Sequence, residues 1–171
     1  MNRRTVLSAS VATVVGLAFL SCDAIAEQKS LSDQLIGTWS LISIDYVRPD
    51  GSRFRTFGDD PQGIAFFDRN GHYIIAVMRS DRPRFAVNDR MKGTADEYKA
   101  AAQGIMTYFG TYAVNESDRT ISIHVASSSF PNWNGTDQKR VVKLAGDELT
   151  LTNPVGSTGG GSAEVVWKRA K

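Results

Sequence analysis

The chain of 171 residues has the length of a single domain. Its 42% hydrophobic and 22% charged residues, with only 5 prolines, exclude intrinsically disordered, collagen-like and coiled-coil proteins. Lysines and arginines number 20 against 18 aspartates and glutamates, and the formal charge of +2 argues against a nucleic-acid partner, because it gives no general attraction to phosphate backbones.

Residues 1–26 have the pattern of an export signal. Arg3 and Arg4 provide its positive start, 11–20 its apolar run, and the Ala-Ile-Ala of 24–26 a cleavage site of small residues. The run is shorter than the roughly 20 residues that span a bilayer, so it does not predict a transmembrane helix. The paired arginines also resemble a twin-arginine signal, with a plain secretory signal as the alternative. We therefore expect a cleaved protein in the periplasm or the extracellular space.

The only cysteine, Cys22, lies inside this signal. After cleavage the chain would offer no disulfide and no thiol nucleophile. A lipid-modified Cys22 is the alternative, but 19–21 fits a lipoprotein cleavage box poorly, whereas 24–26 fits a soluble export signal. We expect 27–34 to be an N-terminal segment and 35–171 to be one domain, because no repeat and no long linker divides it.

From residue 35 onward, short segments of strand-forming residues alternate with turn residues. The Asn70-Gly71 pair is the clearest turn signal, because these residues tolerate the positive φ angles of a tight hairpin. Short strands joined in this way favour an all-β, antiparallel up-and-down barrel of about 8–10 strands over a sandwich, since closure removes exposed strand edges. The predicted strands are 38–47, 53–57, 63–68, 72–79, 111–115, 120–127, 139–145, 148–152 and 163–169.

One helix is predicted over 94–107, between the fourth and fifth strands. Thr94 and Glu97 form a capping box at its start. Apolar residues then recur at helical spacing through Met106 and Phe109. Because this apolar stripe needs a cover, we expect the helix to pack on the sheet or on the open end of the barrel, as a lid or plug.

Several motifs resemble those of a known family. Gly37-Thr38-Trp39 opens the first predicted strand with the Gly-x-Trp pattern of lipocalins. Further similarity lies at 63–68, 78–86, 93–98 and 130–136. Together these segments resemble the bacterial and fungal lipocalin-like domain family, and the resemblance covers about 33–169.

The resemblance implies a calycin-type barrel that binds small molecules. It also implies that Gly37 and Trp39 are structural residues, with Trp39 closing one end of the barrel. Arg169 or Lys168 from the last strand would cross the indole ring, a cation–π contact worth roughly 0.5–2 kcal/mol. The resemblance supplies no catalytic residues and no particular ligand.

Three arginines, Arg79, Arg82 and Arg84, lie close together around Pro83. The proline keeps this segment extended, so the guanidinium groups could surround the barrel mouth and bind a carboxylate. The alternative is a charge-balanced surface loop, because aspartates such as Asp81 lie next to these arginines.

His124 occupies a strand with one polar and one apolar face. Ser122 shares its face, whereas Ile121 and Ile123 lie on the other. If the polar face lines the barrel interior, His124 is a candidate general acid–base, since its ordinary pKa of about 6.5 lies near working pH. If the apolar face lies inside, His124 is a solvated surface residue.

Four aromatic residues with polar tips, Tyr98, Tyr108, Tyr112 and Trp133, lie near the predicted helix and the loop 130–136. Such side chains line pockets that are mainly apolar, and the alternative is that they are ordinary core residues. The loop around Trp133 would either border the ligand entrance or fold back as a plug.

The two histidines, His72 and His124, do not form a metal motif, because a zinc site needs three or four close ligands. Phosphate-binding, dinucleotide-binding and serine-nucleophile motifs are also missing from the sequence. We therefore expect neither a metal nor another cofactor.

The sequence supports three functional hypotheses. The first is an exported lipocalin-like protein that binds a small, largely apolar ligand inside its barrel, including one with a carboxylate. The second is a barrel-enclosed isomerase or cyclase that uses His124, Tyr112 or Arg79 for proton transfer or charge stabilisation. The third is a filled barrel that serves as an interaction module of the cell envelope. The sequence leaves open whether any reaction occurs and which oligomer forms.

Overall fold

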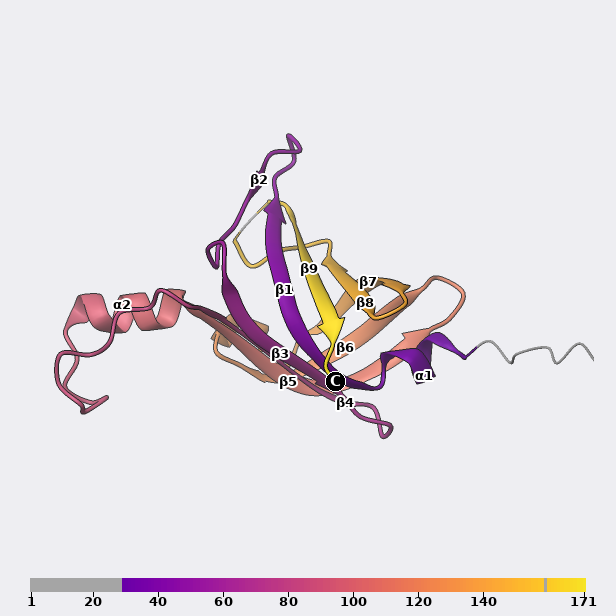
Figure 1. The fold of residues 1–171 in the computed structure, drawn as a ribbon, viewed down its shortest axis with the longest axis horizontal. Helices are drawn as coiled ribbons and strands as arrows, with labels where there is room; N and C mark the ends of the chain where they lie inside the picture. The colour runs from indigo at the N-terminus through magenta and orange to yellow at the C-terminus, as the bar shows by residue number, and fades with distance from the viewer. Residues whose placement is uncertain (1–28, 159) are drawn as a thin grey trace, which may run out of the picture.

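The structure, a computed structural model, describes residues 29–158 and 160–171. The predicted export signal and Cys22 lie outside these residues. Within them, no helix has both the length and the apolar character needed to cross a membrane. The elements are, in chain order (Figure 1), α1 (Leu31–Leu35), β1 (Gly37–Val47), β2 (Arg53–Phe54), β3 (Pro61–Phe67), β4 (His72–Arg79), α2 (Ala95–Gln103), β5 (Ile105–Asn115), β6 (Thr120–Ser128), the 3-10 helix η1 (Pro131–Trp133), β7 (Asp137–Ala145), β8 (Glu148–Asn153) and β9 (Ser162–Arg169).

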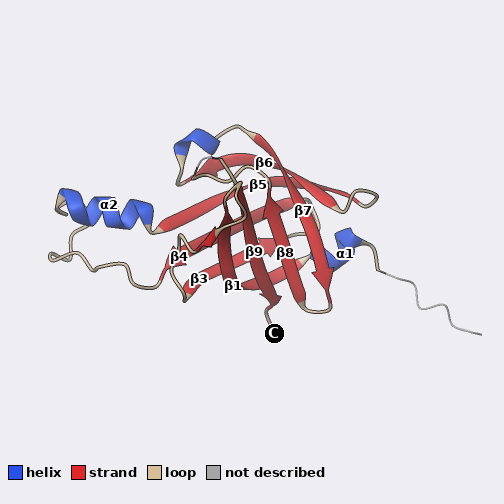
Figure 2. Ribbon diagram, turned by 90° about the horizontal axis from the view of Figure 1, so that it is seen from above, coloured by secondary structure: helices blue, strands red, loops and turns tan. Residues whose placement is uncertain are grey.

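Each barrel strand pairs with its neighbour along the chain, and the sheet closes on itself. The order is β1-β3-β4-β5-β6-β7-β8-β9, and β9 pairs back with β1 in antiparallel register from Trp39↔Arg169 to Val47↔Ser162. Strand β2 pairs only with the end of β1, outside the closed sheet. The predicted antiparallel up-and-down barrel is therefore confirmed, with eight strands in the closed sheet (Figure 1, Figure 2).

Side chains alternate between the barrel interior and the outer surface. On β6, Ile121, Ile123 and Val125 are buried, whereas Ser122 and His124 are exposed. Burying one large apolar side chain contributes about 1.5–3 kcal/mol. The apolar core therefore lies inside the barrel, where residues from all eight strands of the closed sheet share one interior.

Helix α1 closes one end of the barrel. Its Leu31 and Leu35 side chains are buried in the core, and the Leu35 carbonyl accepts a hydrogen bond from Trp39 Nε1 at 2.9 Å. The Glu116 carboxylate, in the β5–β6 turn, accepts the backbone N–H groups of Leu31 and Ser32 at 2.8 and 2.9 Å. A carboxylate is favourable there because the first N–H groups of a helix lack partners within it. No helix was predicted for this N-terminal segment.

Trp39 and Arg169 join β1, β9 and α1 at this closed end. Trp39 is fully buried, and the guanidinium carbon of Arg169 lies 4.1 Å from the centroid of its ring. The same guanidinium donates to the carbonyls of Ile36, at 3.1 Å, and Gln34. Gly37 has a φ of +127°, which favours glycine, and a Cβ there would approach Arg169 closely. The structure thus places Arg169 where the resemblance implied, across the indole ring of Trp39.

Helix α2 begins as predicted but is shorter. The Thr94 side chain accepts the Glu97 N–H, and the Glu97 carboxylate accepts the Thr94 N–H at 2.7 Å, which completes the capping box. The prediction of helix over 104–107 was wrong. Gly104 offers its carbonyl to the N–H of Arg79 at 2.9 Å, so pairing with β4 takes over from the helix. The residues that follow are rich in aromatic and β-branched types, which favour a strand.

The prediction that this helix covers the barrel was also wrong. Helix α2 has no buried residue. It projects away from the barrel beside the end of β4 and the start of β5 (Figure 1, Figure 2). Met106 and Phe109, which were predicted to extend the apolar stripe of this helix, belong to β5 instead. The helix that remains is therefore too polar to need a large apolar surface against it.

Candidate ligand-binding site

The barrel contains a cavity toward the end opposite Trp39. The space between protein atoms there is about 660 Å³ when the part open to solvent is included. A space of this size suits a compact ligand of about one substituted ring.

One wall of the cavity is built in rows by strands β8, β9 and β1. Leu151 pairs with Val165, which pairs with Ile44, and these three side chains form an apolar row. A second row lies two positions further along each strand, toward the mouth. In this row Asn153 pairs with Ala163, and Ala163 pairs with Tyr46. Since residues two apart share a face of a strand, the second row also lines the cavity and gives it polar groups at one end.

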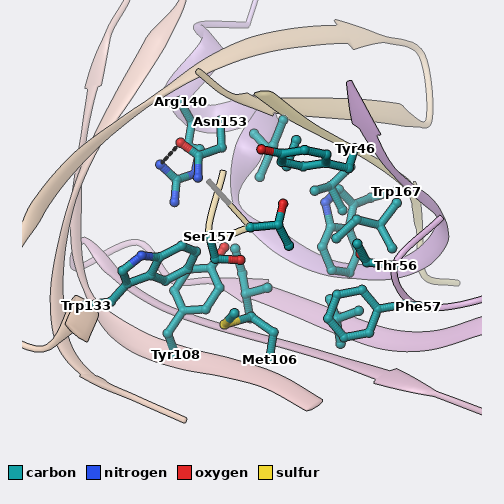
Figure 3. A pocket seen from close by; sticks show the side chains of 17 residues that line it. Tyr46, Thr56, Phe57, Met106, Tyr108, Trp133, Arg140, Asn153, Ser157 and Trp167 are labelled. Carbon is teal, nitrogen blue, oxygen red and sulfur yellow. Dashed lines mark hydrogen bonds between the residues drawn. The ribbon is translucent and has the colours of Figure 1, made fainter. Parts of the chain in front are cut away.

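The facing wall is aromatic and aliphatic. Ile75 and Val77 come from β4, and Met106 and Tyr108 come from β5. Trp133 reaches the cavity from η1 and meets the ring of Tyr108 edge to face, with 5.2 Å between centroids. Figure 3 shows the rings of Tyr108 and Trp133 together on one side of the space. Such a wall favours a flat, apolar ligand.

Arg140 is the cation of this cavity, and it is only 4% exposed. Its Nη1 donates to Asn153 Oδ1 at 3.0 Å and to the Lys139 carbonyl at 3.1 Å. Its Nη2 donates to Gln138 Oε1 at 2.5 Å, and its guanidinium carbon lies 5.8 Å from the centroid of the Trp133 ring. All these partners are neutral, although a buried charge is costly without a counter-charge.

Trp167 offers a second donor. Its side chain is 1% exposed, lines the cavity, and has an Nε1–H group with no hydrogen-bond partner among the described residues. A buried N–H without a partner costs about 1–3 kcal/mol. In Figure 3 the indole nitrogen of Trp167 is turned toward the space between the labelled side chains. A ligand oxygen or a water could satisfy this group.

The β8–β9 loop forms part of the mouth. Ser157 and Thr158 line the cavity and are exposed to solvent. Gly156 and Gly161 hold the loop against Tyr46, because a Cβ on Gly156 would collide with the tyrosine ring and one on Gly161 would meet its hydroxyl at 3.0 Å. The close packing of glycine on Tyr46 fixes where the mouth lies.

A family model for the lipocalin-like domain matches residues 36–170, which is most of the chain. The protein belongs to the lipocalin-like domain family. Over 82 residues it is 35% identical to the 4'-hydroxy-3'-methoxypropiophenone carrier protein of Aspergillus oryzae (strain ATCC 42149 / RIB 40), and this stretch covers 44% of the present chain and 74% of that protein. A lipocalin-like protein from Bacteroides uniformis ATCC 8492 aligns with a TM-score of 0.43 and 17% identity, covering 80% of this chain and 98% of that one.

Of the ligand-binding residues predicted from the sequence, Tyr108 and Trp133 line the cavity of this lipocalin-like barrel. Tyr112 packs edge to face on Phe67 instead, and its hydroxyl donates to the Asp68 carbonyl at 2.7 Å. Burial raises the pKa of the Tyr112 phenol above its usual range. Tyr98 lies exposed on α2, where its hydroxyl accepts the N–H of Gly93 at 2.9 Å.

The three clustered arginines do not line the cavity. Arg79 forms a bidentate pair with Asp81, with Nε 2.8 Å and Nη2 2.6 Å from its oxygens, and the carboxylate raises the pKa of Arg79. Arg82 donates to the Arg79 carbonyl at 3.1 Å, and Arg84 is exposed. The placement matches the charge-balanced loop, which the sequence left open as an alternative.

His124 lies on the outer surface of the barrel, because the apolar face of β6 is the inner one. Its Nδ1 lies 2.8 Å from Asp137 Oδ1, and both side chains are at least half exposed. The structure therefore does not bring together His124, Tyr112 and Arg79. No group of three or more histidine, cysteine or acidic residues in the described chain could hold a metal ion.

Cavity residues that were not predicted from the sequence include Tyr46, Arg140, Asn153 and Trp167. A signal for Arg140 was present, since it shares a strand face with the apolar Val142. A charged residue on an inward-facing pattern is unusual and marks either a functional group or a buried ion pair.

Proposed function

We propose that this protein is a carrier that binds a small, largely apolar ligand with one aromatic ring inside its barrel. The observation that carries the proposal is the cavity itself. Its walls are aromatic and aliphatic, and its few polar groups, Arg140, Asn153 and Trp167 Nε1, are buried in a rigid closed sheet. This combination is typical of a small-molecule site, in which apolar area gives affinity and a few polar groups fix orientation.

The similarity to a fungal carrier supports this proposal. That relative is named for a hydroxylated, methoxylated aryl ketone, a single ring with polar substituents. A ring of this kind suits the Tyr108–Trp133 wall, where an offset or edge-to-face contact contributes about 0.5–1.5 kcal/mol beyond area burial.

The positions of the candidate catalytic groups favour binding over catalysis. A proton-transfer group must come within hydrogen-bond reach of its substrate. His124 lies on the outer face of β6 beside Asp137, Arg79 is paired with Asp81 at the end of β4, and the Tyr112 hydroxyl donates to a backbone carbonyl. These three groups thus have no common space in which to meet one substrate.

We further propose that the carrier acts outside the cytoplasm. The support is the sequence pattern of residues 1–26, with its paired arginines, apolar run and small-residue cleavage site. N-terminal sequencing of the protein from a periplasmic or culture fraction should begin near Glu27. Full-length protein confined to the cytoplasmic fraction would contradict this location.

The binding proposal is tested by titrating the protein with 4'-hydroxy-3'-methoxypropiophenone and following tryptophan fluorescence, since Trp133 and Trp167 line the cavity. The matched variants are Ala163→Phe and Ala113→Phe. Ala163 lies between Asn153 and Tyr46 in the wall, so a phenyl ring there would fill the cavity, whereas Ala113 is exposed on β5.

We expect saturable binding by the wild type and A113F, and loss of binding by A163F. Overpacking costs about 1–3 kcal/mol of stability, so a thermal melt must show that A163F remains folded. Equal binding by A163F, or no binding by the wild type, would contradict a site inside the barrel.

A further inference from the structure

We propose that the ligand of this cavity is an aromatic carboxylate, and that Arg140 holds its acidic group. This inference rests on the proposed carrier function and adds the charge of the ligand to it. Arg140 is 4% exposed, lines the cavity, and has no carboxylate within 4 Å among the described residues. The other described residues that line the cavity include no aspartate, glutamate or lysine, so the formal charge of this described lining is +1.

The hydrogen bonds of Arg140 are incomplete without a ligand. A guanidinium group has five N–H donors. Nη1 uses both of its hydrogens, on Asn153 and the Lys139 carbonyl, and Nη2 uses one, on Gln138. The Nε–H and the second Nη2 hydrogen therefore have no partner in the described chain. These two donors are available to a ligand oxygen.

Arg79 is an example, in the same molecule, of an arginine whose guanidinium group is paired with a carboxylate. Its Nε and Nη2 both reach the Asp81 carboxylate, at 2.8 and 2.6 Å, on the surface. Arg140 has the Nε–H and one Nη2 hydrogen left over, but no acidic side chain beside it. A ligand carboxylate would supply the missing counter-charge with charge-assisted hydrogen bonds, which are about twice as strong as neutral ones.

Two neighbouring groups would complete the binding of the carboxylate. Asn153 Oδ1 already accepts from Arg140 and, at 3.2 Å, from the N–H of Val155, so its amide nitrogen is left as a donor. Figure 3 shows this nitrogen turned toward the cavity beside the guanidinium. Trp167 Nε1–H is an independent second sign of a missing acceptor, because it is buried in the cavity wall without a partner.

The test compares each acid with its neutral isostere. Probes are benzoate, 4-hydroxybenzoate and cinnamate, each paired with its amide, titrated at pH 7 by calorimetry. Arg140→Met removes the cation while nearly keeping its volume, and a thermal melt must show that this variant remains folded, because it leaves the acceptors on Gln138 and Asn153 without their donor. Arg84→Met is the matched control, because Arg84 is exposed outside the cavity. Arg140→Lys provides a second variant that keeps the charge but loses the planar fork.

We expect the wild type and R84M to bind at least one acid about 10- to 100-fold more tightly than its amide, as one or two charge-assisted contacts imply. R140M should lose that preference and bind acid and amide alike, and R140K should lie between. Equal binding of acid and amide by the wild type would overturn the carboxylate while leaving the carrier function intact. No binding of any probe, together with no binding of the aryl ketone, would overturn both.

Discussion

Arg169 lies across the indole ring of Trp39 and at the same time donates to the carbonyls of Gln34, in α1, and Ile36, between α1 and β1. The last strand of the barrel is thereby joined to its first strand and to the helix that closes the end. The cavity lies toward the other end of the barrel, around Arg140 and Tyr46. If the cavity binds the ligand as proposed, variants at the Trp39 end should change stability and variants at the cavity end should change binding.

Arg169→Met should destabilise the protein by about 1–3 kcal/mol, because it removes a cation–π contact and leaves two carbonyls without their donor. Urea denaturation followed by far-UV circular dichroism would measure the loss. The exposed neighbour Lys168→Met is the control and should change little. Ligand affinity should stay within about twofold for R169M, since the contact lies outside the cavity. An unchanged urea midpoint would contradict the bridging role of Arg169.

Glu116→Gln should loosen helix α1. The carboxylate accepts two N–H groups at the start of the helix, and the amide keeps one acceptor oxygen but loses the charge that favours a helix N-terminus. We expect a loss of about 1 kcal/mol. Hydrogen exchange should show faster exchange at Leu31 through Leu35 while strands β5 and β6 keep their protection. Unaltered exchange in α1 would mean that the buried leucines alone hold it.

Gly110→Ala should be among the most damaging small substitutions in the barrel. At this position the β5–β6 register shifts, and a Cβ would collide with the backbone carbonyl of His124. The backbone cannot yield as a flexible side chain can, so we expect a loss of about 2 kcal/mol or more. Thr111→Ala, at the next and exposed position, is the control. Comparable thermal melting of G110A and the wild type would show that the strand adapts freely.

Lowering the pH should weaken the capping box of α2, because it protonates the Glu97 carboxylate. Hydrogen bonds from the backbone N–H groups of Thr94 and then Ala86 lower the pKa of Glu97 below its usual value. Because the pKa of Glu97 is lower in the folded than in the unfolded chain, its contribution is complete above about pH 4.3 and is lost as pH falls through the lower, folded pKa.

An NMR titration of the Glu97 side-chain carboxyl carbon measures this pKa directly. Glu97→Gln should remove the acid-dependent part of α2 stability and leave the barrel unaffected, because α2 has no buried residue. A Glu97 pKa at or above about 4.3, the ordinary value for glutamate, would contradict the capping geometry.

The parts of the fold that depend on local pattern were predictable. The Thr94–Glu97 capping box and the alternation of β6 are signals carried within a few residues, and both occur in the structure. The end of α2 was predicted wrongly because Ile105 and Met106 fit a helical spacing as well as a strand. Pairing with β4 decides between the two, and that contact is long-range.

The candidate site was harder to predict because a cavity depends on barrel closure. Arg79, Arg82 and Arg84 were predicted to bind a ligand because they lie close together in the sequence. In the structure Arg79 forms an ion pair with the nearby Asp81 instead. Arg140 and Asn153 are 13 residues apart and meet only because β7 and β8 pair. Tyr46 joins them through the closing β9–β1 pairing, which no local pattern indicates.

Locating the bound ligand is the most direct test of binding inside the barrel. Intermolecular nuclear Overhauser contacts should be measured between 4'-hydroxy-3'-methoxypropiophenone and the protein. We expect contacts from the ligand ring to the indole protons of Trp133 and Trp167 and to the ring of Tyr108, all of which line the cavity. Contacts confined to exposed apolar residues of the outer surface, such as Phe66 and Phe109, would contradict it.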